Sequence, residues 1–140
     1  MALQSGILIW LVGALVGSML FFAFTVAPTV FRALPAEHAG SFLRAFFPNY
    51  YLWGLIVALI TAALAMATSA TVAVACLLVA LLFVFARQSL MPRINLARDQ
   101  ESEGIAGATK RFKVLHLWSV LINGFQMLVL LAAAGLLLWS

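Results

Sequence analysis

Four long apolar runs dominate the sequence, and short stretches that contain the charged residues separate them. A helix that crosses the hydrocarbon of a bilayer needs about 20 mainly apolar residues. The run from Tyr50 to Leu90 is too long for one crossing, so we place a tight turn at Thr68-Ser69-Ala70-Thr71. The pattern predicts an all-α, integral membrane four-helix bundle with up-down topology, one transmembrane domain over residues 1–140 whose spans cover residues 6–27, 50–68, 71–90 and 114–139.

Composition agrees with a chain whose solvent is mostly lipid. Of the 140 residues, 66% are hydrophobic and 9% are charged, and the mean hydropathy is +1.14. A soluble domain of this size carries more charge. The first five residues contain no Lys or Arg and the following apolar run is long, so we expect a retained first span and no cleaved signal peptide. The single cysteine, Cys76, lies inside an apolar run and is expected to be a small buried residue.

The charged residues predict the orientation. The eight Lys and Arg and the four Asp and Glu all lie between spans one and two, or at and between the facing ends of spans three and four. Lys and Arg are enriched in cytoplasmic loops. We therefore expect a multi-pass protein of the bacterial inner (plasma) membrane with both termini outside. The pI near 10.0 is attributed to these loops, and nucleic-acid binding is not expected because its usual basic signatures are missing.

Two segments between the spans mix charged and apolar residues. Residues 31–49 combine Arg, Glu and His38 with several phenylalanines, which is typical of a short amphipathic helix lying on the inner leaflet. His38 is expected to be surface-exposed. Residues 93–113 are expected to form a loop, flexible around Gly104 and Gly107, that contacts anionic lipid.

Polar residues form a narrow stripe along the fourth span. His116, Ser119, Asn123 and Gln126 are spaced three, four and three apart, which places them within one arc of a helix. Such a stripe must face other helices or a cavity. It indicates either interhelical hydrogen bonds or a site built around His116. In the first span, the Gly13–Gly17 pair would let another helix approach closely, within the chain or in a homo-oligomer.

Several polar residues meet at the predicted cytoplasmic ends of the spans. Arg87 lies inside an apolar run, so its guanidinium must snorkel, pair or line a wet pocket. We hypothesise a basic, His-containing pocket in which arginines bind a carboxylate or phosphate of an anionic lipid or amphipathic small molecule. The alternative is that the arginines only hold the helix ends at the interface. The candidate residues are His116 as a catalytic group and Arg32, Asn49, Arg87, Arg93, Ser119 and Asn123 as ligand-binding groups.

Four segments resemble the transmembrane protein 205-like family, whose function has long been described as unknown. They are residues 24–35 (FTVAPTVFRALP), 46–51 (FFPNYY), 87–93 (RQSLMPR) and 112–124 (FKVLHLWSVLING). The resemblance implies a four-span fold, and the loop between spans three and four is much shorter here than in vertebrate members. The family pattern falls on Arg32, Phe47, Pro48, Arg87, Pro92, Arg93 and His116 of this chain.

The chain is also similar in size and architecture to the small haem-associated membrane protoporphyrinogen oxidases of bacteria. This second resemblance implies an oxidoreductase acting on a tetrapyrrole, in which His116 would bind haem iron or move a proton. The chain has no Cys-x-x-Cys-His, so any haem would be haem b. Their N-terminal His-rich signature is absent, since no His precedes His38.

A third class is a small oligomeric transporter or channel. Proton-coupled exporters of this size usually need a carboxylate within a span, and none of the four predicted spans has one. The residues alone leave the choice open between an enzyme and a binding protein. A binding protein with a basic pocket at the inner leaflet requires the fewest features that the sequence lacks.

Overall fold

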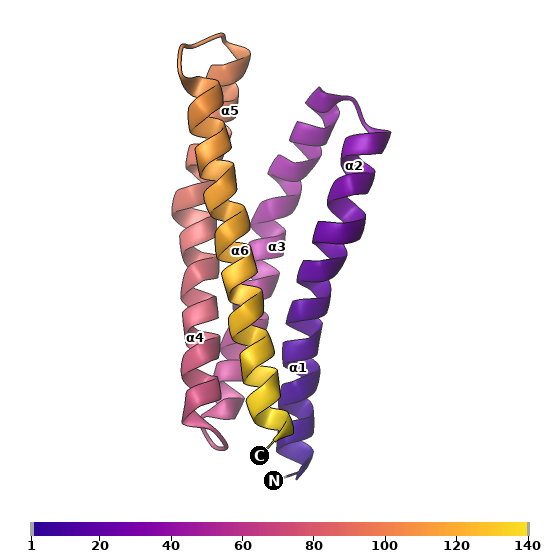
Figure 1. The fold of residues 1–140 in the computed structure, drawn as a ribbon, viewed down its shortest axis with the longest axis vertical. Helices are drawn as coiled ribbons and strands as arrows, with labels where there is room; N and C mark the ends of the chain where they lie inside the picture. Colours follow the sequence, from indigo (N-terminus) through magenta and orange to yellow (C-terminus); the bar gives the residue numbers. More distant parts are fainter. Residues whose placement is uncertain (1, 140) are drawn as a thin grey trace.

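The computed structural model describes residues 2–139, so Met1 and Ser140 of the predicted domain lie outside the described residues. Within this range the chain forms four long helices (Figure 1). The second is α3 (Ala36–Ala65) and the fourth is α6 (Ala108–Leu138). The first and third each contain a π-helical turn: they are α1 (Ala2–Phe21), η1 (Phe22–Val26) and α2 (Ala27–Ala33), and α4 (Ala70–Phe85), η2 (Ala86–Leu90) and α5 (Met91–Ser102).

All four helices are long and apolar enough to span a membrane, which confirms the predicted all-α membrane fold. These helices comprise 30 to 33 residues each. At 1.5 Å per residue these helices are about 45–50 Å long, whereas the hydrocarbon of a bilayer is about 30 Å thick. Each helix therefore extends beyond the hydrocarbon, and the polar α5 lies in that extension.

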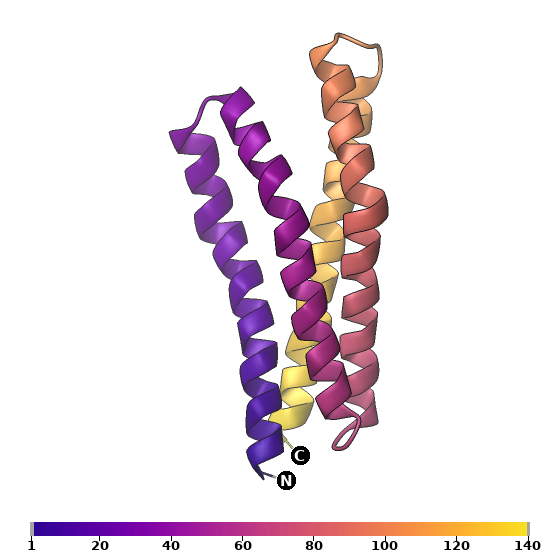
Figure 2. The same ribbon diagram turned by 180° about the vertical axis from the view of Figure 1, so that it is seen from behind.

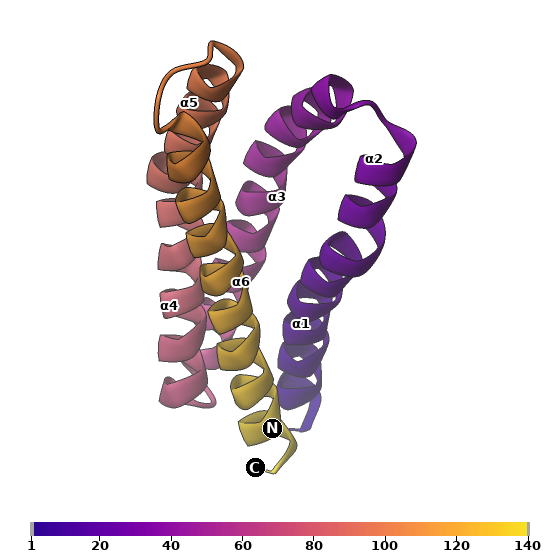
Figure 3. The same ribbon diagram turned by 45° about the horizontal axis from the view of Figure 1, so that its top comes forward.

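The helices alternate in direction, as predicted. The two termini and the α3–α4 turn lie at one end of the bundle, and the α2–α3 turn and the α5–α6 loop lie at the other (Figures 1 and 2). We call the second the charged end, because the charged residues of the chain are carried by these two connections and the helix segments that flank them. Toward this end the pair α2–α3 diverges from the pair α5–α6 (Figure 3).

The core is built around the close pair α3 and α4, whose contact is the most extensive in the bundle. Small residues dominate the facing sides: Gly54 is buried in α3, and alanines of both helices are buried nearby. Small side chains let helices approach closely in lipid, where van der Waals packing drives association. Cys76 is buried in this core, as predicted. The buried alanines are Ala58, Ala62, Ala65, Ala73 and Ala80.

The turn between α3 and α4 covers residues 66–69 and overlaps the predicted break. Ser69 is extended, with φ −151° and ψ 106°, and its hydroxyl accepts a hydrogen bond from the backbone N–H of Val72 at 3.4 Å. Serine is a favoured N-cap because it satisfies one of the free N–H groups at a helix start. The local sequence therefore starts α4 at Ala70.

The predicted loop over residues 93–113 is wrong, and the third helix does not stop at Leu90, where the predicted third span ends. The third helix continues through Pro92 to Ser102, and the connection to α6 covers residues 103–107. A proline inside a regular helix clashes with the carbonyl four residues earlier. The wider π-turn η2 directly precedes Met91-Pro92, and the Met91 N–H donates to the carbonyl of Ala86, five residues back. The turn η1 stands in the same relation to Pro28.

The predicted surface helix over residues 31–49 is also wrong. Most of this segment is the start of α3, which continues without interruption past Pro48 to Ala65. The chain reverses at Leu34, which is extended with φ −116° and ψ 143°. A residue before proline is disfavoured in the helical region, and Leu34 precedes Pro35. The charged residues of this segment therefore continue the line of the second span.

Candidate functional site

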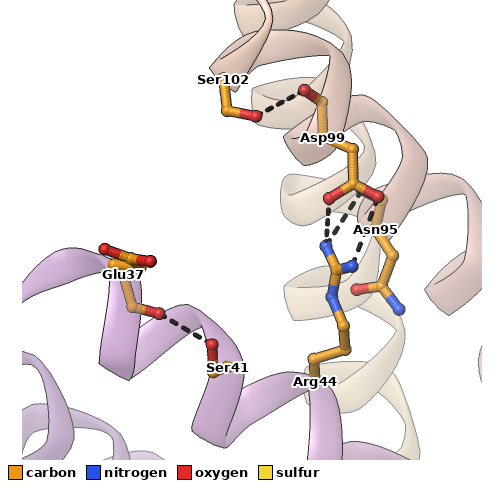
Figure 4. Close-up of polar contacts among 6 residues, drawn as sticks. All are labelled: Glu37, Ser41, Arg44, Asn95, Asp99 and Ser102. Carbon is orange, nitrogen blue, oxygen red and sulfur yellow. Dashed lines mark hydrogen bonds and ion pairs between the residues drawn. The ribbon is translucent and has the colours of Figure 1, made fainter.

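One ion pair connects the two diverging helix pairs at the charged end. Arg44 of α3 donates from Nη2 to Oδ1 of Asp99 in α5 at 2.6 Å and from Nη1 to Oδ2 at 3.3 Å (Figure 4). Nη2 also lies 3.5 Å from the carbonyl oxygen of Asn95. The hydrogen bonds from Arg44 lower the pKa of Asp99 below its usual value. Both side chains are about half exposed, so water screens the pair and its effect on stability is small.

A second cluster joins α5 to the beginning of α6. The guanidinium of Arg98 lies over the ring of Phe112, 4.8 Å from its centroid. The Phe112 ring is nearly parallel to the imidazole of His116, with 5.9 Å between centroids. Arg111 donates from Nη2 to Oε1 of Gln100 at 2.9 Å. His116 thus belongs to the α5–α6 side of the charged end.

Arg32 and Arg87 use their guanidinium groups in the same way. The Nε of Arg87 in η2 donates to the carbonyl of Pro48 in α3 at 3.2 Å, and the Nε of Arg32 donates to the carbonyl of Pro28 at 3.1 Å. No group within residues 2–139 accepts a hydrogen bond from the Nη atoms of either side chain. Arg87 is partly buried and Arg32 is exposed. Both residues therefore hold two donor groups ready for an anion.

The polar stripe of α6 joins other helices at two of its four residues, Asn123 and Gln126. Gln126 is buried and donates from Nε2 to the carbonyl of Val79 in α4 at 3.1 Å. Asn123 accepts from the hydroxyl of Tyr50 in α3 at 3.4 Å. Ser119 donates to the carbonyl of His116 in its own helix at 2.7 Å. At Gln126 and Asn123 the contacts are the interhelical hydrogen bonds of the packing interpretation.

Sequence reasoning missed a groove between the first helix and α3. Its volume is about 360 Å³, and its surface is almost entirely apolar. Phe22 of η1 is central, because its ring centroid lies 5.1–5.2 Å from those of Phe46, Phe47 and Tyr50. The aromatic residues of α3 recur at helical spacing, a signal that could have indicated this face. The walls are formed by Ser18, Phe21, Phe22 and Val26 and by Phe46, Asn49, Tyr50 and Trp53.

The predicted site residues occupy several places at the charged end. Asn49 lines the groove, and its amide donates to the carbonyl of Ala45 at 3.4 Å. Arg32 and Arg87 are not among the groove residues, and neither is His116. Arg93 is exposed on α5, without a polar partner among the residues that the structure describes. His38 is exposed near the start of α3. The candidate arginines therefore occupy separate positions and do not line one common pocket within the described residues.

A family model for a domain of unknown function, DUF4149, matches residues 10–103. The chain belongs to the DUF4149 family. The matched part of this DUF4149 protein runs from α1 to the end of α5 and contains Arg32, Asn49, Arg87 and Arg93. His116, Ser119 and Asn123 follow it, in α6. No curated protein and no solved structure matches the chain.

Within residues 2–139 of the DUF4149 protein, no group of three or more His, Cys, Asp or Glu side chains could hold a metal ion. A haem iron needs fewer protein ligands than such a group supplies, so its binding by His116 stays a prediction. The relation to the transmembrane protein 205-like family stays a prediction as well.

Proposed function

We propose that the protein binds an anionic amphipathic molecule of the bilayer at its charged end, which faces the cytoplasm. The observation that carries this proposal is the hydrogen bonding of the guanidinium groups of Arg32 and Arg87. Each guanidinium is fixed through Nε to the backbone carbonyl of a proline, while both Nη groups have no acceptor within residues 2–139. A guanidinium presents paired N–H donors that match the oxygens of a phosphate or carboxylate.

The position of Arg87 supports an anion as its partner. It lies in η2, about a turn before Pro92, where the apolar part of the third helix ends. A charge near hydrocarbon is costly unless it is paired or reaches the interface. Across the chain the net charge is +4, and the ion pair seen in residues 2–139 engages Arg44 with Asp99. Anionic headgroups would compensate this excess, since basic residues at the membrane surface attract them.

The test measures retention of phosphatidylglycerol against phosphatidylcholine by native mass spectrometry of the detergent-purified protein. We expect preferential retention of phosphatidylglycerol, and we expect Arg87→Gln to weaken it about tenfold, the value of one charge-assisted contact. Arg87→Lys keeps the charge but loses the fork, so it should restore part of the affinity. Arg111→Gln is the matched control, because it removes the same charge from a residue that already donates to Gln100.

Two outcomes contradict the proposal. Equal retention of the two lipids by the wild-type protein would show that headgroup charge is not recognised. An equal loss of binding in Arg111→Gln and Arg87→Gln would show diffuse attraction to the basic surface.

The orientation is a separate expected result. Alkaline phosphatase fused to the C-terminus should be active outside the cytoplasm, and green fluorescent protein fused there should stay dark. In the Gly104→Cys variant, the new thiol should react with impermeant thiol reagents only after the membrane is opened, since the α5–α6 loop would be cytoplasmic. If the green fluorescent protein fused to the C-terminus is fluorescent instead, the C-terminus is cytoplasmic and the charged end lies outside the cytoplasm.

The other function classes stay predictions. A tetrapyrrole oxidoreductase would require haem b held by His116, and a Soret band lost in His116→Ala would reveal it. A small transporter or channel would require an oligomeric pore. Neither class has a structural observation in its favour comparable to the open guanidinium groups of Arg32 and Arg87.

A further inference from the structure

The groove between α1–η1 and α3 lies between the middle of the bundle and its charged end. Its residues lie in the second half of the first helix and in the middle of α3. Aromatic rings form most of its surface, and Phe22 packs against the α3 wall at Phe46 and Tyr50. An apolar, largely aromatic groove of this kind is complementary to a hydrocarbon chain.

A polar interaction lies at the end of the groove farthest from the charged end. The indole Nε1–H of Trp53 lies 3.4 Å from the hydroxyl oxygen of Ser18, which joins the two walls. The Ser18 hydroxyl donates in turn to the carbonyl of Leu15 at 2.8 Å. These polar groups satisfy one another, so the surface left for a ligand is apolar. The groove therefore suits an acyl chain.

Arg32 lies between the groove and the charged end of the bundle. Arg32 lies six residues after the groove residue Val26, and its Nε is held at the carbonyl of Pro28, two residues after Val26. Its side chain thus extends back along α2 to the level of Pro28. Its Nη groups have no acceptor in the part of the chain that the structure describes. An apolar groove followed by an open guanidinium is complementary to an anionic phospholipid, in both charge and polarity.

We propose that the groove between α1–η1 and α3 holds one acyl chain of an anionic phospholipid whose phosphate pairs with Arg32. This inference rests on the proposed function. It identifies the ligand as an anionic phospholipid and its binding site as the groove beside Arg32. The lipid joins the first helix to α3 where the two diverge from α5 and α6.

Trp53 provides the readout, because brominated acyl chains quench tryptophan fluorescence on contact. The protein would carry Trp53 alone, with Trp10, Trp118 and Trp139, which are exposed, changed to Phe. Small amounts of dibromo-phosphatidylglycerol or dibromo-phosphatidylcholine would be added in a phosphatidylcholine nanodisc. We expect phosphatidylglycerol to half-quench Trp53 at about a tenfold lower fraction than phosphatidylcholine, and Arg32→Gln to remove this difference.

Two controls separate the groove from the general lipid surface. A protein with Trp118 as its single tryptophan, on α6, should be quenched equally by the two lipids. Val26→Phe fills the groove and should abolish the preference at Trp53. Val120→Phe makes the same change at an exposed position of α6 and should leave it intact.

Equal quenching of Trp53 by the two lipids would overturn the groove assignment. If native mass spectrometry still showed Arg87-dependent retention of phosphatidylglycerol, the proposed function would stand and the seat would be elsewhere. If that retention were also absent, both proposals would fail. A preference at Trp53 that survives Val26→Phe would likewise place the lipid outside the groove.

Discussion

Gly54→Val should destabilise the bundle by about 3 kcal/mol, the upper range for overpacking a well-packed interior. A Cβ at Gly54 would lie less than 3.0 Å from three ring atoms of Phe83. The ring is buried at the α3–α4 contact and lies near Tyr50 and Tyr51, so it has little room to move. Unfolding by sodium dodecyl sulfate in mixed micelles, followed by circular dichroism, measures the loss.

The control for Gly54 is Gly13→Val, because a Cβ at Gly13 meets nothing within 4 Å. It should change stability by less than about 0.5 kcal/mol. A second substitution, Phe83→Ala, should partly restore the Gly54→Val protein, since it removes the obstructing ring. If Gly54→Val unfolds at the wild-type detergent fraction, α3 and α4 do not approach as closely as described.

Phe22→Ala is expected to cost about 2–3 kcal/mol. Its ring contacts three aromatic rings of α3, and each such pair contributes roughly 0.5–1.5 kcal/mol beyond simple burial. The cost should stay below the roughly 3–5 kcal/mol of soluble cores, because lipid replaces water as the solvent of the unpaired helix. The same detergent titration measures it.

Phe24→Ala is the matched control in the same π-turn. The Phe24 side chain is 76% exposed, so its truncation should leave the detergent midpoint close to that of the wild type. Equal shifts for the two variants would show that the ring contacts of Phe22 do not hold the first helix against α3.

The sequence predicts the helices and their polarity because both depend on local composition. Apolar length identifies four spans, and the clustering of Lys and Arg places the charged residues at one end. It fails at Pro92, where π-turn η2 lets the helix continue. The sequence-based prediction also fails at residues 31–49. There one extended residue, Leu34, separates two helices, and α3 continues past Pro48 without interruption.

The candidate site is predicted only in part, because its contacts join distant parts of the chain. The pairing of Arg44 with Asp99 spans 55 positions, and the contact of Arg87 with the Pro48 carbonyl spans 39. No periodicity specifies such partners. The residues from His116 to Gln126 lie on one helix, but only packing shows that Asn123 and Gln126 bond to other helices while Ser119 bonds within α6.

The helix lengths also determine how much of the protein extends beyond the hydrocarbon. The third helix is 33 residues long, about 50 Å, and it exceeds the roughly 30 Å hydrocarbon by some 20 Å. The polar helix α5 accounts for excess length at the charged end, and the five-residue connection 103–107 joins it there to α6. The aqueous side at the charged end therefore meets helices that are already ordered, and the entropy cost of that ordering is met when the chain folds.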